Sequence, residues 1–189
     1  MFNRSLFLLF GVVLSFSLCF SQAVPSPVRD PREVPDSIKG SVFSRSVAYS
    51  GTDSITITYH SPAVRKRIIW GGLVPYGDVW VTGAHNATTL ETTRTLRMED
   101  QELAPGKYAL FTIPGPDQWT IIINKNWNQH LAWDYDAKDD LLRFSVKPEP
   151  AEHLERLQYF IEDQQADTII FAMRWERVKF AWKASVKKE

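Results

Sequence analysis

Apolar and polar side chains alternate at every second residue along much of this chain, and this alternation restricts the fold more than any other feature. The clearest example is residues 178–187, where Val, Phe, Trp, Ala and Val alternate with Lys, Ala, Lys, Ser and Lys. Because successive side chains of a β-strand point to opposite faces, this segment is predicted to be a strand. One of its faces packs against the interior, and the other carries lysines into water.

The same period of two recurs from about residue 41 onward. It covers residues 54–60, 90–98, 108–113, 142–146 and 157–161, whereas residues 168–175 are almost continuously apolar. Proline-glycine turns at 104–107 and 114–117 predict two consecutive hairpins. Residues 150–158 are the best candidate for a short helix. The pattern predicts an all-β fold, a single-domain antiparallel β-sandwich or squat barrel of about ten short strands with little helix.

Residues 1–21 have the pattern of an export signal. Arg4 is the only charged residue there, and residues 6–20 are nearly all apolar. This run is shorter than the roughly 20 residues that span a membrane and fits the core of a cleaved signal peptide. Cleavage is expected after Ser21, with Ala23 as a second option. We therefore expect an exported protein, periplasmic or extracellular, with no stable membrane span after cleavage.

Cys19 raises the alternative of a lipoprotein. A lipobox has a small residue before the cysteine and a leucine three positions before it, but Leu18 and Phe16 stand there. Lipidation is therefore the less favoured alternative. Because Cys19 is the only cysteine, cleavage after Ser21 leaves a chain without disulfides or thiol chemistry.

Residues 22–40 contain four prolines and few large apolar groups. Proline removes backbone donors and resists helix and central strand, so these residues are predicted to be a flexible leader before a single domain at residues 41–189. The whole chain carries 22 basic and 22 acidic residues and has no net charge. Nucleic-acid-binding proteins usually have a clear basic excess, so this balance argues against a nucleic-acid partner.

Several motifs resemble those of one known family. They are residues 61–67 (Ser-Pro-Ala-Val-Arg-Lys-Arg), 69–77 (Ile-Trp-Gly-Gly-Leu-Val-Pro-Tyr-Gly), 80–88 and 103–115. In order and spacing they resemble the domain of unknown function 2911 family of secreted bacterial proteins, and the likeness covers most of the chain after the signal. No activity is assigned to that family, so the resemblance implies no catalytic residue.

The first candidate site is the glycine-rich segment 69–89 together with the arginines before it. The segment holds two tryptophans, four glycines and a His-Asn pair, and its glycines suggest backbone turns that a Cβ would obstruct. Indole faces, guanidinium groups, and amide and imidazole donors can bind a sugar or a small anion. The candidate ligand-binding residues are Arg65, Arg67, Trp70, Trp80, His85 and Asn86.

A structural role is the alternative for this segment. Tryptophans are highly buried on average, so Trp70 and Trp80 are favoured as a plug at the end of the sandwich. The glycines would then form tight corners. The roles of Arg67, His85 and Asn86 stay open.

The second candidate site is the polar-aromatic segment 124–136, which contains Trp127 and Trp133. Exposed indole rings stack on the C–H faces of sugars, and the neighbouring Asn, Gln and Asp side chains can fix hydroxyl groups. The alternative, which we favour, is a long connection between strands whose aromatic residues anchor it to the core. Loops nevertheless carry function more often than strands do.

The remaining chemistry-bearing residues predict no metal or cofactor site. The four histidines, His60, His85, His130 and His153, show no metal-binding spacing. Neighbouring acids at 134 and 136, and at 139 and 140, are typical of solvated turns rather than of the carboxylate pair of a hydrolase. The leading hypothesis is a non-catalytic binding module for a small polar ligand such as a glycan. The alternatives are an envelope hydrolase that uses His85 with nearby carboxylates, and a structural or assembly protein.

Overall fold

The computed structural model describes residues 28–50, 52–164 and 167–186. The predicted signal peptide at 1–21, with Cys19, lies outside these residues, as does the first part of the predicted leader at 22–27. Within the described residues, no helix is long and apolar enough to cross a membrane.

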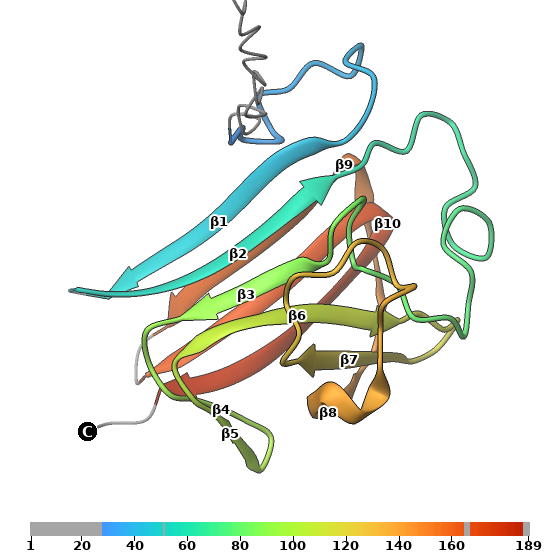
Figure 1. Ribbon diagram of the computed structural model, residues 1–189. Coiled ribbons are helices and arrows are strands. Elements are labelled where there is room, and N and C mark those ends of the chain that lie inside the picture. Colours follow the sequence, from blue (N-terminus) through green and yellow to red (C-terminus); the bar gives the residue numbers. More distant parts are fainter. Residues whose placement is uncertain (1–27, 51, 165–166, 187–189) are drawn as a thin grey trace, which may run out of the picture.

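Ten antiparallel strands form two sheets, which lie as two layers (Figure 1). The first sheet has the order β1-β2-β3-β6-β7-β8, and the second has the order β5-β4-β10-β9. The six-stranded sheet consists of β1 (Val42–Ser50), β2 (Asp53–Ser61), β3 (Thr88–Thr92), β6 (Gly106–Ile113), β7 (Trp119–Asn124) and β8 (Asp140–Val146). The four-stranded sheet consists of β4 (Leu96–Met98), β5 (Gln101–Leu103), β9 (Glu149–Gln164) and β10 (Thr168–Val186). The prediction of an all-β antiparallel sandwich is confirmed, and the sheets do not close into a barrel.

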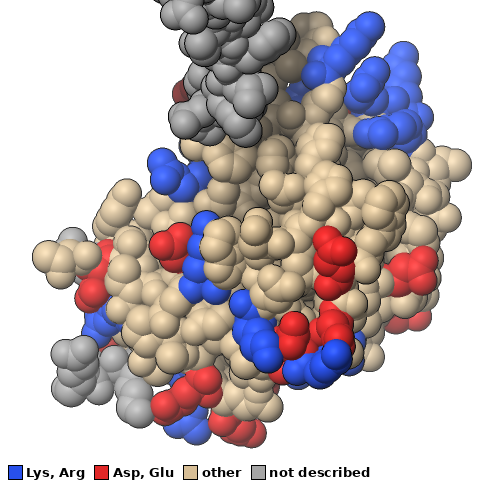
Figure 2. All heavy atoms as spheres, viewed as in Figure 1, with Lys and Arg blue, Asp and Glu red and all other residues tan. Residues whose placement is uncertain are grey.

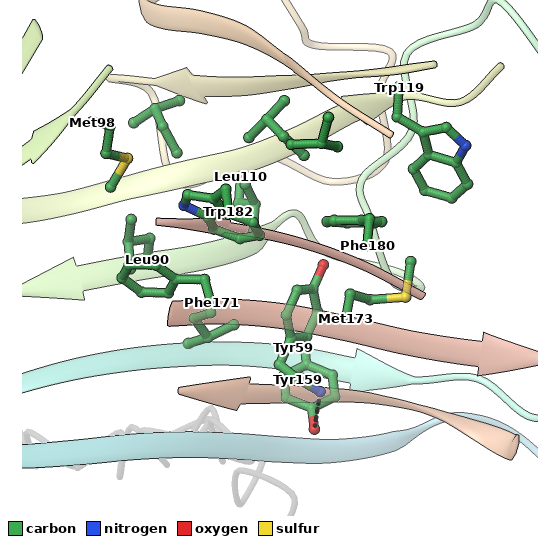
Figure 3. Close-up of a cluster of buried hydrophobic side chains, with 14 of the residues drawn as sticks. Tyr59, Leu90, Met98, Leu110, Trp119, Tyr159, Phe171, Met173, Phe180 and Trp182 are labelled. Atoms are coloured by element: carbon green, nitrogen blue, oxygen red, sulfur yellow. Dashed lines mark hydrogen bonds between the residues drawn. The ribbon is translucent and has the colours of Figure 1, made fainter. Parts of the chain in front are cut away.

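The main core lies between the two sheets, as Figure 3 shows. Along β2, Ile55, Ile57 and Tyr59 are buried, whereas the residues between them are less so. The sequence shows the same alternation at 54–60. It points the apolar side chains of β2 toward β9 and β10. Burial of apolar surface contributes about 25 cal/mol per Å², so these facing sets supply the main drive for folding.

Strand β10 joins two segments that the sequence shows as separate patterns. Phe171, Met173 and Trp175 face the core in its first half, whereas Phe180 and Trp182 face it in the second. The register with β9 shifts on both sides of Glu176, whose φ is +56°. A bulge of this kind inserts an extra residue, so the buried set changes from odd to even numbers without a break in the strand.

Two sequence predictions are wrong. The turn after Leu103 does not make a hairpin, because β5 pairs with β4 in one sheet and β6 pairs with β3 in the other. This turn therefore carries the chain from one layer to the other, and only the β6–β7 hairpin is confirmed. The predicted helix at 150–158 is part of β9, which β10 pairs along its length. Long-range pairing overrides local preference there.

The described part of the leader lies against the domain. Backbone N–H of Arg29 donates to the carbonyl of Phe43 at 2.8 Å, and the guanidinium of Arg156 donates to the carbonyls of Ile38 and Gly40 at 2.7 and 3.3 Å. Arg156 is only 2% exposed and Val34 only 8%.

Replacing a core leucine tests the two-layer arrangement. Leu110 on β6 is fully buried between the sheets, so Leu110→Ala should lower the free energy of unfolding by about 2–5 kcal/mol. The matched control is Leu141→Ala on β8, where the side chain is 45% exposed and the expected change is within about 0.5 kcal/mol. Urea unfolding measures both. Similar losses in the two variants would contradict this assignment of the core.

Candidate functional site

The outer face of the six-stranded sheet carries a second, smaller apolar cluster. Val81, Ala87, Ala109, Phe111 and Ile122 are buried there, on the side away from the four-stranded sheet. Parts of the β2–β3 and β7–β8 connections cover this cluster, since Val79, Ala132 and Tyr135 pack against it. Two loops distant in sequence therefore meet over one sheet face.

Trp70 and Trp80 lie with Trp119 and Trp175 at the main core. The ring centroid of Trp70 is 5.8 Å from that of Trp80, 4.8 Å from that of Trp119 and 5.6 Å from that of Trp175, each in an edge-on orientation. Edge-on aromatic pairs contribute about 0.5–1.5 kcal/mol beyond their buried area. Nε1 of Trp80 donates to the carbonyl of Gly83 at 3.0 Å. These contacts favour the structural alternative for both residues.

The indole N–H groups of Trp70 and Trp175 are buried without a conventional hydrogen-bond acceptor in the described residues. The edge-on packing within the tryptophan cluster brings ring edges against ring faces, and a ring face accepts a weak hydrogen bond from N–H.

Arg65 and Arg67 lie at the start of the same connection, outside the pocket described below. Backbone N–H of Arg65 donates to Oε1 of Glu155 at 2.8 Å. The guanidinium of Arg67 donates to the carbonyls of Val64 and Ala63 at 3.1 and 2.6 Å. Arg67 therefore closes its own turn, and neither arginine joins His85 at one site.

His85, Asn86 and Trp127 do come together, around a pocket of about 140 Å³ on the outer face of the six-stranded sheet. Asn86 and Trp127 line the pocket, and the ring of His85 contacts the ring of His60 beside it. The floor comes from strands, with Phe43, Thr58, His60, Thr89 and Lys107. The rim comes from the two loops, with Asn86, Ala87, Trp127, Asn128 and Gln129.

Backbone pairing holds the two rims together. Ala87 N–H donates to the carbonyl of Gln129 at 2.9 Å, and Leu131 N–H donates to the carbonyl of His85 at 2.8 Å. Nδ1 of His130 lies 2.9 Å from Oδ1 of Asn86, which accepts a hydrogen bond when that nitrogen carries the proton. The left-handed backbone of His85, with φ of +62°, belongs to this junction.

Asn124, at the end of β7, sets the path of the loop that carries Trp127. Its Nδ2 donates to the carbonyl of Asp136 at 3.1 Å and to Oδ1 of Asp140 at 2.8 Å, while its Oδ1 accepts from backbone N–H of Asn126 at 2.9 Å. Asn124 is fully buried, so these bonds replace those that water would make. One side chain thus closes both ends of the loop.

Gln129 has a buried acceptor without a donor. Its Nε2 donates to the carbonyl of Asn126 and to Oδ1 of Asn124, which fixes the orientation of the amide. Its Oε1 is buried and has no hydrogen-bond partner among the described residues. Leaving a buried acceptor unpaired costs about 1–3 kcal/mol of stability. This acceptor belongs to a residue that lines the pocket.

Lys107 and Trp127 form the charged and aromatic side of the pocket. Nζ of Lys107 lies 4.3 Å from the centroid of the Trp127 ring, a cation–π distance. Trp127 is 43% exposed. The carboxylate of Glu91 is 4.0 Å from the ammonium at an exposed position, where an ion pair contributes little.

The other candidate tryptophan lies apart from the pocket. Trp133 is 85% exposed and is not among the residues that line the pocket. Metal binding finds no support in the described residues, where no group of three or more His, Cys, Asp or Glu side chains is arranged to hold an ion.

Sequence reasoning missed His60, Lys107 and Phe43 as pocket residues, whereas Gln129 lies within the predicted candidate segment 124–136. His60 and Lys107 are outward positions of alternating strands, and the sequence shows only that they face away from the core. Which outward residues share a pocket depends on strand register and on the loops above them. The loop residues carried a readable signal because polar and aromatic groups are concentrated there.

An all-β sandwich with a loop-lined pocket on one outer face is the class of domain that these observations define. Residues 43–184 match the family model described as "Protein of unknown function (DUF2911)", so the chain belongs to that family. This match confirms the resemblance seen in the motifs. No curated protein and no solved structure matches the chain.

His60 and His85 form a pair whose electrostatic interaction can be tested. Partial burial, and then the nearby His85, lower the pKa of His60 from its ordinary value of 6.5. The ring centroids of the two histidines are 5.3 Å apart. Protonation of His60 is therefore easier in the unfolded chain. The stabilising contribution of neutral His60 to the folded protein is fully present above pH 6.5, and it is lost as the pH falls through the lowered pKa of His60.

We expect His85→Gln to raise the pKa of His60 without restoring its ordinary value, because burial is the larger cause and remains. Titration followed by NMR of the imidazole proton measures this pKa. His153→Gln removes an imidazole elsewhere on the surface and should leave the His60 titration unchanged. A His60 pKa that does not respond to His85→Gln would contradict the pairing.

Proposed function

We propose that this protein is a non-catalytic binding module that holds a small polar ligand, such as a glycan, in the pocket beside Trp127. Support comes from the kind of groups that line the pocket. The rings of Trp127 and Phe43 offer apolar faces, and Asn128 and Gln129 offer amide groups. This combination of apolar surface with a few polar groups is typical of small-molecule sites.

The unpartnered Oε1 of Gln129 carries the proposal. Its amide nitrogen is already committed to two acceptors, so the amide cannot turn around without losing those bonds. Because Oε1 is closed to solvent, a ligand hydroxyl would donate to it only after a small shift of Gln129 on binding, and that bond would offset the cost of the unpaired acceptor. A sugar presents hydroxyl donors beside apolar C–H faces, which matches the combination of Gln129 and Trp127.

The pocket volume limits the size of the ligand. Sites for drug-sized molecules are about 300–1,000 Å³. At about 140 Å³ this pocket suits one sugar ring or the end of a longer chain. The wider glycan would then lie across the surface.

Binding is favoured over hydrolysis because none of the residues described as lining the pocket is Asp or Glu. Hydrolysis of a glycoside commonly needs two carboxyl groups on opposite sides of the bond. His85 with His60 supplies imidazoles but no carboxylate partner at the pocket wall. We retain export as part of the proposal, since the signal pattern at 1–21 suits a protein that meets glycans outside the cytoplasm.

Calorimetric titration with a panel of oligosaccharides tests the proposal. For any oligosaccharide that binds, Trp127→Ala should weaken the affinity about tenfold or more, as expected for an aromatic residue central to a site. Trp133→Ala is the matched control, because that indole is far more exposed and does not line the pocket. The affinity of the Trp133→Ala variant should equal that of the unsubstituted protein.

Two outcomes would contradict the proposal. One is the absence of heat with every oligosaccharide together with an unchanged melting temperature. The other is equal loss of affinity in Trp127→Ala and Trp133→Ala, which would move binding away from the pocket. Thermal melting of each variant checks that the fold is retained.

A further inference from the structure

A second surface of interest is the basic-apolar loop, residues 65–76, which follows β2 and does not contribute to the pocket. Three large apolar side chains are exposed on it: Ile68 is 78% exposed, Leu73 47% and Tyr76 45%. Single exposed apolar residues are common, but three on one loop form a patch that calls for a physical reason.

These side chains gather around one glycine pair. A Cβ added to Gly71 would lie 3.1 Å from the ring of Tyr76, and one added to Gly72 would lie 3.0 Å from Cγ2 of Ile68. Backbone N–H of Leu73 donates to the carbonyl of Ile68 at 3.0 Å. The two adjacent glycines therefore let the side chains of Tyr76 and Ile68 lie close against the backbone of the loop.

The loop is held rigidly from below. Ile69 and Val74 are each only 2% exposed, and Val74 N–H donates to the carbonyl of Ile69 at 2.9 Å. Trp70 lies within the tryptophan cluster of the main core. Because Ile69, Trp70 and Val74 occupy the space below the loop, Ile68 and Tyr76 cannot turn inward without displacing these core residues.

Cations flank the apolar patch. Arg65, Lys66 and Arg67 are exposed and consecutive, and none of them is in an ion pair described for this chain. Arg65 and Lys66 have left-handed φ values of +50° and +56°, which non-glycine residues adopt only at a cost. Figure 2 shows Lys and Arg side chains gathered at the upper right, over the loop that follows β2.

We propose that the basic-apolar loop docks on an anionic lipid surface. Arg65 and Lys66 would contact negatively charged headgroups, while Ile68, Leu73 and Tyr76 would enter the interface between headgroups and acyl chains. A lipid surface fits better than a peptide because cations and exposed apolar side chains lie on the same loop, and an anionic membrane offers headgroups and acyl chains to both kinds of group. A rigid, protruding patch with mixed charge and apolar surface suits a broad, soft partner.

Sedimentation with vesicles tests this docking. The purified protein should bind vesicles of phosphatidylglycerol mixed with phosphatidylcholine, and binding to phosphatidylcholine alone should be much weaker. Lys66→Glu should weaken binding about fivefold or more, since one basic residue near an anionic surface contributes about that factor. Lys183→Glu, at an exposed position of β10, makes the same charge change elsewhere and should have a smaller effect.

The apolar contribution needs its own pair of variants. Leu73→Ser should weaken binding to the anionic vesicles, whereas Leu141→Ser, at a leucine of similar exposure on β8, should not. Because residues 6–20 are themselves apolar, a local measurement is also required. An environment-sensitive dye on Ile68→Cys, in a Cys19→Ser background, should report an apolar surrounding on binding, and the same dye on Leu141→Cys should not.

Three results would overturn the proposal. They are equal binding to neutral and anionic vesicles, equal effects of Lys66→Glu and Lys183→Glu, and no response of the dye at position 68. Strong binding of a soluble polyanion such as heparin, together with no effect of Leu73→Ser on vesicle binding, would instead assign the loop to an acidic polymer. None of these results depends on whether the pocket beside Trp127 binds an oligosaccharide.

Discussion

The central strands β6 and β7 are buried on both faces, and the rest of the structure follows from this constraint. Leu110 and Ile121 face the main core, whereas Phe111 and Ile122 face the opposite side and are equally buried. The four-stranded sheet can cover only one of these faces. The other requires loops, since apolar surface left in water would cost about 25 cal/mol per Å². The long β2–β3 and β7–β8 connections supply that cover.

The pocket exists because the two covering loops do not extend over the whole outer face. They meet through the pairing of Ala87 with Gln129 and leave the strands toward β1 and β2 partly open. Polar side chains such as His60 lie on that open part. Asn124 then fixes the loop that carries Trp127 at the boundary between apolar cover and polar floor. The loops that bury the apolar cluster thus leave a partly open surface of mixed polar and apolar residues beside it.

The sequence predicted the layers better than it predicted their connections. Alternation at 54–60 and 178–187 sets which side chains face inward, and that property is local. The false hairpin after Leu103 shows what is not local, because a turn of the same residue types can join two strands of one sheet or cross between sheets. Site residues divide in the same way. Trp127 was readable from its loop, whereas His60 and Lys107 depend on register, which alternation does not specify.

One connection, residues 62–87, contributes in turn to the main core, to the exposed patch and to the pocket. Its Trp70 and Trp80 enter the main core, its Ile68 and Tyr76 remain exposed, and its Asn86 reaches the pocket. Because the tryptophans anchor the segment, the exposed patch and the pocket rim keep fixed positions relative to the same core. Changes to the tryptophans would therefore disturb both surfaces at once, and only substitutions of exposed side chains can separate them. Both proposed surfaces are therefore attached to the same core through this one connection.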